Sequence, residues 1–144
     1  MKIIKLLSIL VAAVLATSAC SGSSGELTIQ DAWARPASAG ENGAAYFVIE
    51  NGTAADDSLL SVSSAIATAS EVHMSMGDAN GVMSMQMQES VTLTARDKVE
   101  FKPGGLHVMF VNLTRDLKVG DTIPLVLNFE NAGSLTIDVP VKAP

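Results

Sequence analysis

Apolar and polar residues alternate in short runs from residue 27 to residue 141, and turn-forming residues separate the runs. Alternation with a period of two puts every second side chain on one face of a strand, which is typical of antiparallel sheets. The pattern predicts strands at Leu27–Trp33, Ala44–Glu50, Leu59–Ser63, Ala69–Met76, Val82–Gln88, Val91–Thr94, Leu106–Asn112, Ile123–Phe129 and Leu135–Val141. Turns are predicted at Asn51-Gly52, Asn80-Gly81, Pro103-Gly104-Gly105 and Asn131-Ala132-Gly133. Short strands in this number, over about 115 residues, favour an all-β fold in which two sheets form a Greek-key β-sandwich.

The first residues have the features of an export signal. Two lysines form a basic start, and the apolar run that follows, Leu6–Ala16, is too short to span a bilayer as a mature helix. Small residues then lead to Cys20, the sole cysteine, which stands where a bacterial lipoprotein signal has its modified cysteine. Thr17 departs from that signal, since leucine is usual there. We predict a signal peptide at residues 1–19 and a lipid anchor on Cys20, while ordinary cleavage would leave Cys20 as a free or paired thiol.

The exported part is predicted to consist of a short tether and one folded domain. Residues 20–25 include a Ser-Gly-Ser-Ser-Gly run of flexible composition, and residues 26–144 are long enough for one domain with one core. We therefore expect the domain in the bacterial cell envelope, on the periplasmic side, touching the membrane only through the lipid on Cys20. Because no second cysteine occurs, stability must come from packing and not from a disulfide framework.

The charge of the chain limits its partners. The formal net charge is −6, and removal of the two lysines of the signal would make it −8, because all acidic residues lie after Cys20. A basic face for nucleic acid is therefore not expected. An acidic surface disfavours anionic lipid and helps to attract a cation, without specifying which cation.

The scarce residues methionine and histidine are crowded together. After the initiator, every methionine and both histidines fall in two clusters, namely His73, Met74, Met76, Met83, Met85 and Met87, then His107 and Met109. Thioether sulfur and neutral imidazole form a soft donor set that suits Cu(I). A hard ion such as Mg²⁺ or Ca²⁺ would require carboxylates and carbonyls instead. The clusters therefore indicate a copper site.

Strand periodicity predicts where these side chains point. In the strand expected at residues 106–112, alternate apolar residues form the natural core face, so His107 and Met109 project together from the other face. A turn at Asn80-Gly81 would bring the first histidine back alongside the alternating methionines of the next strand. One hairpin and one further strand can thus deliver four donors to a common point, namely His73, Met85, His107 and Met109.

Structural interpretations of the same residues stay open. A methionine stripe with a period of two is more often core packing than a ligand set, because methionine fills irregular gaps. A lone histidine is usually solvated or hydrogen-bonded. Met76, Met83 and Met87 are candidates for alternative ligands or for a transfer surface, although a structural role is favoured for Met83.

Several segments together resemble one known family. The spacing His73-Met74, ten residues, Met85, twenty-one residues, His107-x-Met109 is similar to that of the PCuAC-type periplasmic copper chaperones. Flanking segments resemble the same family, and they are Asp31–Arg35, Ala45–Phe47, Gly81–Met85, Pro103–His107, Gly120-Asp121 and Leu127–Glu130. The resemblance covers nearly all of the chain after the tether.

The resemblance has implications for fold, ligands and function. It implies a cupredoxin-like β-sandwich that binds one Cu(I) per chain near its surface. By position, the ligands of the family correspond to His73, Met85, His107 and Met109, whereas Met74 matches an optional residue and is not counted. It also implies a metallochaperone, not an enzyme. Such a protein would deliver copper by ligand exchange towards cytochrome c oxidase assembly, either to subunit II or through a thiol-bearing copper chaperone.

Other functions are weighed against this one. A blue-copper electron carrier needs a cysteine thiolate, and the only cysteine precedes the tether. A zinc hydrolase is poorly supported because His₃ and His₂Glu ligand sets are missing. A periplasmic copper buffer, with the same site but no delivery partner, stays open. So does a surface β-sandwich adhesin in which the methionines only pack.

Overall fold

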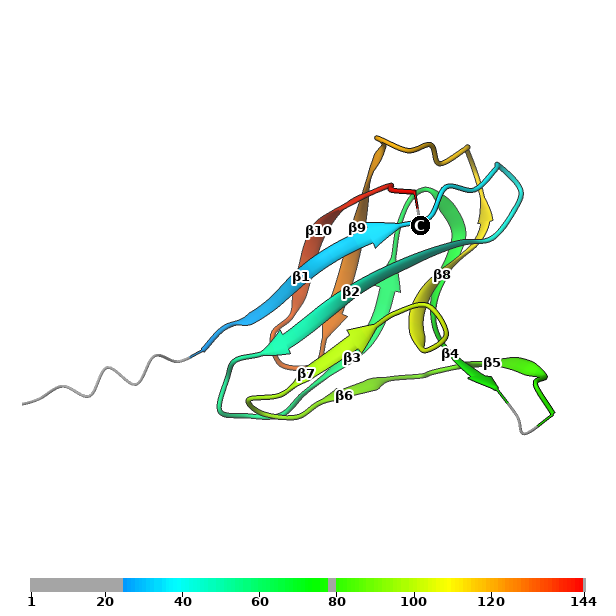
Figure 1. Ribbon diagram of the computed structural model, residues 1–144. Helices are drawn as coiled ribbons and strands as arrows, with labels where there is room; N and C mark the ends of the chain where they lie inside the picture. The colour runs from blue at the N-terminus through cyan, green and yellow to red at the C-terminus, as the bar shows by residue number, and fades with distance from the viewer. Residues whose placement is uncertain (1–24, 78–79, 144) are drawn as a thin grey trace, which may run out of the picture.

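The computed structural model describes residues 25–77 and 80–143 (Figure 1). The predicted signal peptide and Cys20, with most of the tether, lie outside these residues. The described part forms ten strands: β1 Leu27–Ala34, β2 Gly43–Asn51, β3 Asp57–Ser63, β4 Ala67–Gly77, β5 Met83–Met87, β6 Val91–Leu93, β7 Lys98–Phe101, β8 Leu106–Leu113, β9 Thr122–Phe129 and β10 Ser134–Pro140. Within it, no helix is long and apolar enough to cross a membrane.

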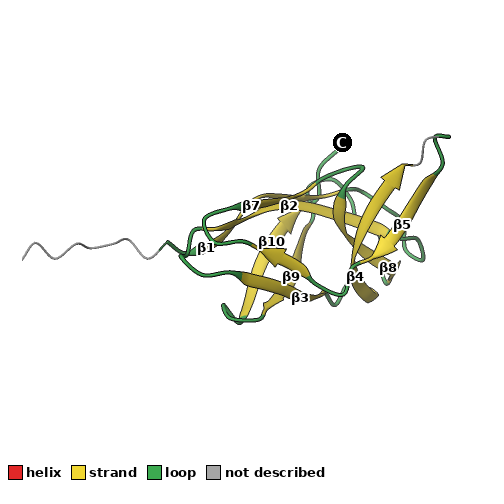
Figure 2. Ribbon diagram, turned by 90° about the horizontal axis from the view of Figure 1, so that it is seen from below, coloured by secondary structure: helices red, strands yellow, loops and turns green. Residues whose placement is uncertain are grey.

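The strands form two sheets that face each other (Figure 2). A six-stranded sheet has the order β1-β2-β7-β8-β4-β5, and a four-stranded sheet has the order β10-β9-β3-β6. All pairings between strands are antiparallel except the short contact between β7 and β8. The predicted all-β, cupredoxin-like Greek-key β-sandwich is confirmed.

The core lies between the two sheets and follows the alternation of the sequence. In β9, buried residues alternate with residues of higher exposure, and the buried ones are Ile123, Leu125, Leu127 and Phe129. In β2, Phe47 and Ile49 point inward, and the ring of Phe47 stacks on Phe101 of β7 at a centroid distance of 4.5 Å. Burial of these faces removes apolar surface from water and is the main stabilising contribution to the fold.

One strand was absent from the sequence prediction. β7 has only four residues, so its alternation is too brief to stand out from the polar segment around it. It is fixed instead by long-range pairing with β2, in which Phe101 lies opposite Phe47. All nine predicted strands are present, with ends displaced by up to two residues.

The β4–β5 hairpin extends from the body of the sandwich (Figure 2). β4 pairs with β8 only as far as Met74, and the Ser75 N–H then donates to the Gly105 carbonyl at 3.1 Å. Beyond Ser75 the strand pairing of the hairpin is that between β4 and β5. β5 forms one edge of the six-stranded sheet, and all five of its residues are exposed. This exposed edge carries three of the methionines singled out by the sequence.

Candidate metal site

Three strands bring the predicted donors to the outer face of the six-stranded sheet. In β4 and β8, His73 lies directly opposite His107, and Glu71 lies opposite Met109. In β5, Met85 lies opposite Ser75. Directly opposed residues of an antiparallel pair share one face, and residues two apart on a strand do as well. All four predicted donors therefore share the outer face, and the predicted hairpin alignment is confirmed.

A cavity of ≈ 340 Å³ opens on this face. Three of the four predicted donors line it, namely Met85, His107 and Met109, and Met83 lines it as well. His73 is not among its lining residues. The ring centroid of His73 lies 6.0 Å from that of His107, so the fourth donor sits beside the cavity.

The ring of His107 is oriented by a neighbouring turn. Although it lies on the outer face, His107 is buried, and its Nδ1 is 3.1 Å from the carbonyl oxygen of Gly105. A carbonyl only accepts hydrogen bonds, so Nδ1 must carry the proton in this contact. The turn itself is closed by the Gly105 N–H, which donates to the Lys102 carbonyl at 3.0 Å, and Gly104 adopts a φ of +79°. The lone pair of His107 is therefore left on Nε2.

The ring of His73 is held by a carboxylate. Its Nε2 is 2.8 Å from Oε2 of Glu71, while its Nδ1 is buried and has no hydrogen-bond partner among the described residues. A buried polar atom without a hydrogen-bond partner lowers the stability of the fold, so its presence points to a functional role. An available nitrogen lone pair at this position fits a metal ligand.

Met109 is contacted by a residue from the loop before β2. Nδ2 of Asn42 lies 4.0 Å from Sδ of Met109, and Oδ1 of Asn42 accepts the backbone N–H of Asn112 at 3.0 Å. Asn112 has a φ of +51°, a left-handed conformation that asparagine adopts more readily than most residues other than glycine. Asn42 therefore contacts both the backbone of β8 and the sulfur of Met109 on the same strand.

Comparison with known proteins agrees with this architecture. The model of the LpqE-like family of lipoproteins matches residues 27–141. The copper-bound PCuAC domain from PmoF2 is 30% identical to this chain and superposes with a TM-score of 0.69. The match covers 84% of this chain and 96% of that domain. The chain belongs to this LpqE-like, PCuAC-type family.

Two further relatives extend the comparison. The solution structure of Cu(I)-DR1885 from Deinococcus radiodurans is 26% identical with a TM-score of 0.62, covering 85% of this chain and 83% of that one. A lipoprotein of Leifsonia xyli subsp. xyli, Lxx21020, is 27% identical over 115 residues, which are 79% of this chain and 68% of the relative.

The exposed methionines of this PCuAC domain do not pack in its core. Met83, Met85 and Met87 are 61%, 63% and 54% exposed. The interpretation of this stripe as core packing is therefore wrong, whereas the structural role favoured for Met83 stays a prediction. The reason is that β5 lies at the edge of the sheet, where its outer face has no opposing layer.

The far wall of the cavity is aromatic and cationic. Tyr46 and Arg35 line it, and the Arg35 guanidinium carbon lies 5.4 Å above the ring centroid of Tyr46. Trp33 packs against Tyr46 at a centroid distance of 4.7 Å, so Tyr46 is buried even though it points outward. The sequence predicted no chemistry for these three residues, although Trp33 was expected to be a core aromatic or part of the wall of the site. Their proximity to the donors depends on the pairing of Ala44 with Met109, which joins positions far apart in the chain.

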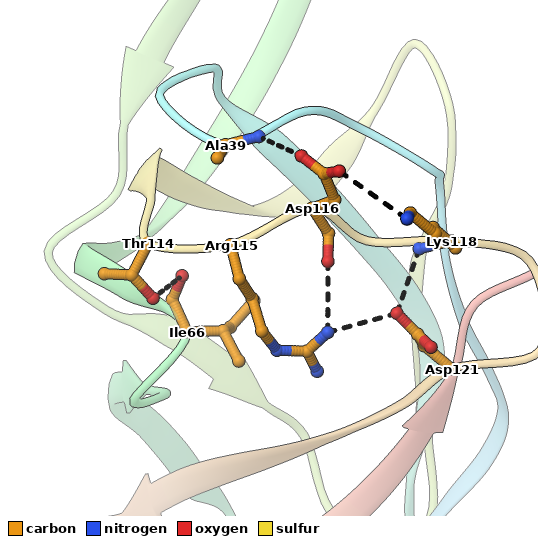
Figure 3. A network of polar contacts seen from close by, with 7 residues as sticks. All are labelled: Ala39, Ile66, Thr114, Arg115, Asp116, Lys118 and Asp121. Atoms are coloured by element: carbon orange, nitrogen blue, oxygen red, sulfur yellow. Dashed lines mark hydrogen bonds and ion pairs between the residues drawn. The ribbon is translucent and has the colours of Figure 1, made fainter.

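A polar network supports the loop that supplies Asn42 (Figure 3). Oδ1 of Asp116 accepts the backbone N–H of Ala39 at 3.0 Å, which ties this loop to the β8–β9 connection. In that connection Asp121 accepts from the Lys118 backbone at 3.0 Å and from the Arg115 side chain at 3.1 Å. These contacts, the Lys118 N–H first and Arg115 next, hold the pKa of Asp121 below its usual value. The network therefore holds in place a loop that lines the cavity, and none of its members is a proposed metal ligand.

Proposed function

We propose that this protein binds one Cu(I) ion through His73, Met85, His107 and Met109 and carries it as a metallochaperone of the cell envelope. The observation that carries the proposal is the gathering of soft donors around one cavity on the outer face, with His73 directly opposite His107. Two thioethers and two imidazoles match the preference of Cu(I) for soft ligands. The copper-bound PmoF2 domain and Cu(I)-DR1885 share the fold and support the same cargo.

The structure also suits release of the ion. Met85 is 63% exposed and lies on an edge strand, so a ligand from a partner can approach the copper before Met85 leaves. Thioethers need no deprotonation, and neutral imidazoles bind above the histidine pKa range. Copper exchange between proteins can therefore proceed through shared coordination, with no free ion at any stage.

Other chemistries have less support. No described residue is a cysteine, so the thiolate of a blue-copper centre is missing from the domain. The described residues also contain no group of three or more His, Cys, Asp and Glu side chains placed to hold a metal ion. A hydrolytic zinc centre would need such a group. We therefore infer a binding protein and not an enzyme.

The destination of the copper is part of the proposal. We infer delivery towards cytochrome c oxidase assembly, to subunit II or through a thiol-bearing copper chaperone, from a lipid anchor at Cys20 on the periplasmic side of the envelope. The lipoprotein relative supports attachment to the envelope. The alternative is a periplasmic copper buffer, which would use the same site without a delivery partner.

An anaerobic Cu(I) titration of the mature protein against a colorimetric chelator tests the site. We expect one tight equivalent in the parent and its loss in the double variant His107→Ala/Met109→Leu. Met76→Leu is the matched control, because Met76 lies opposite Ser84 and points to the other face of the hairpin. A double variant that folds and binds Cu(I) as tightly as the parent would show that the ligand assignment is wrong.

A deletion strain separates delivery from buffering. If the protein delivers copper, cytochrome c oxidase activity should fall in the deletion strain and return on addition of copper or of the parent gene. If it only buffers copper, oxidase activity should be normal and tolerance to excess copper should be reduced. The variant Cys20→Ala, in the same strain, tests whether the anchor matters to either outcome.

A further inference from the structure

Glu71 stands next to the proposed copper site without being one of its predicted donors. It lies two residues before His73 on β4, so both side chains project from the outer face. On β8 it lies directly opposite Met109. Its side chain is only 35% exposed, and its Oε2 is 2.8 Å from Nε2 of His73.

This contact decides which nitrogen of His73 carries the proton. An ionised carboxylate only accepts hydrogen bonds, so the neutral ring must donate from Nε2. The lone pair is then on Nδ1, which is buried and has no hydrogen-bond partner among the described residues. Glu71 thus leaves one available ligand atom on His73 and determines which atom it is.

The second histidine has the opposite arrangement. The Gly105 carbonyl engages Nδ1 of His107 and leaves Nε2 available. Each ring therefore has one nitrogen fixed by an acceptor of the protein and the other left for a ligand. Acceptors of this kind around a metal-binding histidine fix its tautomer and orientation and increase its basicity.

We propose that Glu71 is a positioning residue, which holds His73 with its proton on Nε2 and presents Nδ1 to Cu(I). The inference rests on the proposed function, because it concerns the same site. All four proposed ligands are neutral, so the Glu71 carboxylate also supplies a negative charge beside the bound cation. Arg35 is the cationic side chain that lines the cavity, and it contacts the Tyr46 ring at the opposite wall.

Two substitutions at this position separate the hydrogen bond from other effects. Glu71→Leu removes the acceptor, while Glu71→Gln retains a carbonyl oxygen that can accept from Nε2–H. Glu50→Leu is the matched control, because Glu50 belongs to the same sheet, is 33% exposed at its side chain, and pairs with Lys98. We expect Glu71→Leu to weaken Cu(I) binding by about 10- to 100-fold. Glu71→Gln should lose less, and Glu50→Leu should bind as the parent does.

Nitrogen-15 NMR of the histidine rings provides a readout that a merely structural role would not change. In the parent without copper we expect a protected Nε2–H on His73 and a proton on Nδ1 of His107. Addition of Cu(I) should shift the resonances of His73 Nδ1 and His107 Nε2, while the protonated nitrogens keep their protons. Glu71→Leu should lose the protected Nε2–H signal, and Glu71→Gln should retain it.

The outcomes distinguish this inference from the proposed function. A parent that binds no Cu(I) overturns the proposed function. A parent that binds Cu(I) through Nε2 of His73 overturns the role of Glu71 alone. The same conclusion follows if Glu71→Leu matches the parent in both ring nitrogen shifts and Cu(I) affinity.

Discussion

Individual polar contacts orient three of the four proposed metal ligands. Glu71, Gly105 and Asn42 each contact one donor, through a carboxylate, a carbonyl and an amide respectively. None of the three was among the sequence candidates. Glu71 was the most accessible to prediction, because a polar residue two positions from a proposed ligand shares its face of the strand.

Asn42 offers a test at the scale of one side chain. Asn42→Ala removes both its contacts, and we expect a loss of unfolding free energy of about 1 kcal/mol from the bond to the Asn112 N–H. Asn42→Asp keeps the acceptor and removes the donor to Met109 Sδ. It should retain stability but shift the Met109 methyl resonance. Urea unfolding and methyl NMR measure the two effects, and equal behaviour of the two variants would contradict the division of roles.

At the scale of elements, Asp57 joins the beginning of β3 to the β9–β10 turn. Its Oδ1 accepts from the backbone N–H groups of Ser58 at 2.7 Å and Asn131 at 2.9 Å, and its Oδ2 accepts from Ala132 at 2.9 Å. Burial by itself raises the pKa of Asp57, but these backbone donors outweigh it and hold the pKa below the usual 3.8. The ionised carboxylate therefore stabilises the contact between the start of β3 and the β9–β10 turn.

This lowered pKa gives a prediction with a definite sign. The stabilisation by Asp57 is present above the pKa of the unfolded chain, near 3.8, and is lost as the pH falls through the lower pKa of the folded state. At neutral pH, Asp57→Asn should lower the unfolding free energy by about 1–3 kcal/mol, since an amide cannot accept at both atoms. In urea titrations, the difference from the parent should shrink as the pH is lowered below 3.8. A constant difference over the whole pH range would exclude this role.

The β4–β5 hairpin should be the least stable part of the larger sheet. β5 is paired on one side only, and all its residues are exposed. We expect the backbone amides of β5 to exchange with solvent faster than those of β8, which lies between β4 and β7 in the sheet. Cu(I) should slow exchange in β5, because the ion would join Met85 to donors on β8. Hydrogen exchange with and without the metal measures both effects, and equal protection of the two strands would contradict the expectation.

At the scale of the whole molecule, the core and the site occupy different faces of one sheet. Leu125 of β9 is fully buried between the sheets, away from the outer face. Leu125→Ala should therefore lower the unfolding free energy by about 2–5 kcal/mol. Cu(I) affinity of the folded variant should match that of the parent, in the chelator titration described above. Loss of binding in a folded variant would show that core and site are coupled.

The sequence predicted the fold class and the face of each donor, because both follow from periodicity within single strands. It did not predict what covers that face. His107 was expected to project outward, and it does, yet it is buried, and the carbonyl of Gly105 in the preceding turn contacts its ring. The far wall of the cavity comes from Arg35 and Tyr46, and the pairing of β2 with β8 that places them depends on contacts distant in the chain. β7 was missed for the same reason, since its pairing with β2 and not its own pattern defines it.

The exposure of Met85 has a chemical cost. A thioether that is 63% exposed is open to peroxides as well as to an incoming ligand, whereas Met109 is partly covered. Oxidation to the sulfoxide turns a soft sulfur donor into a polar group, and sulfoxide reductases can reverse the change. The exposure that favours transfer of the metal ion therefore makes Met85 the proposed ligand that is oxidised most readily. Reduction of the Met85 sulfoxide would then determine what fraction of the protein can bind Cu(I).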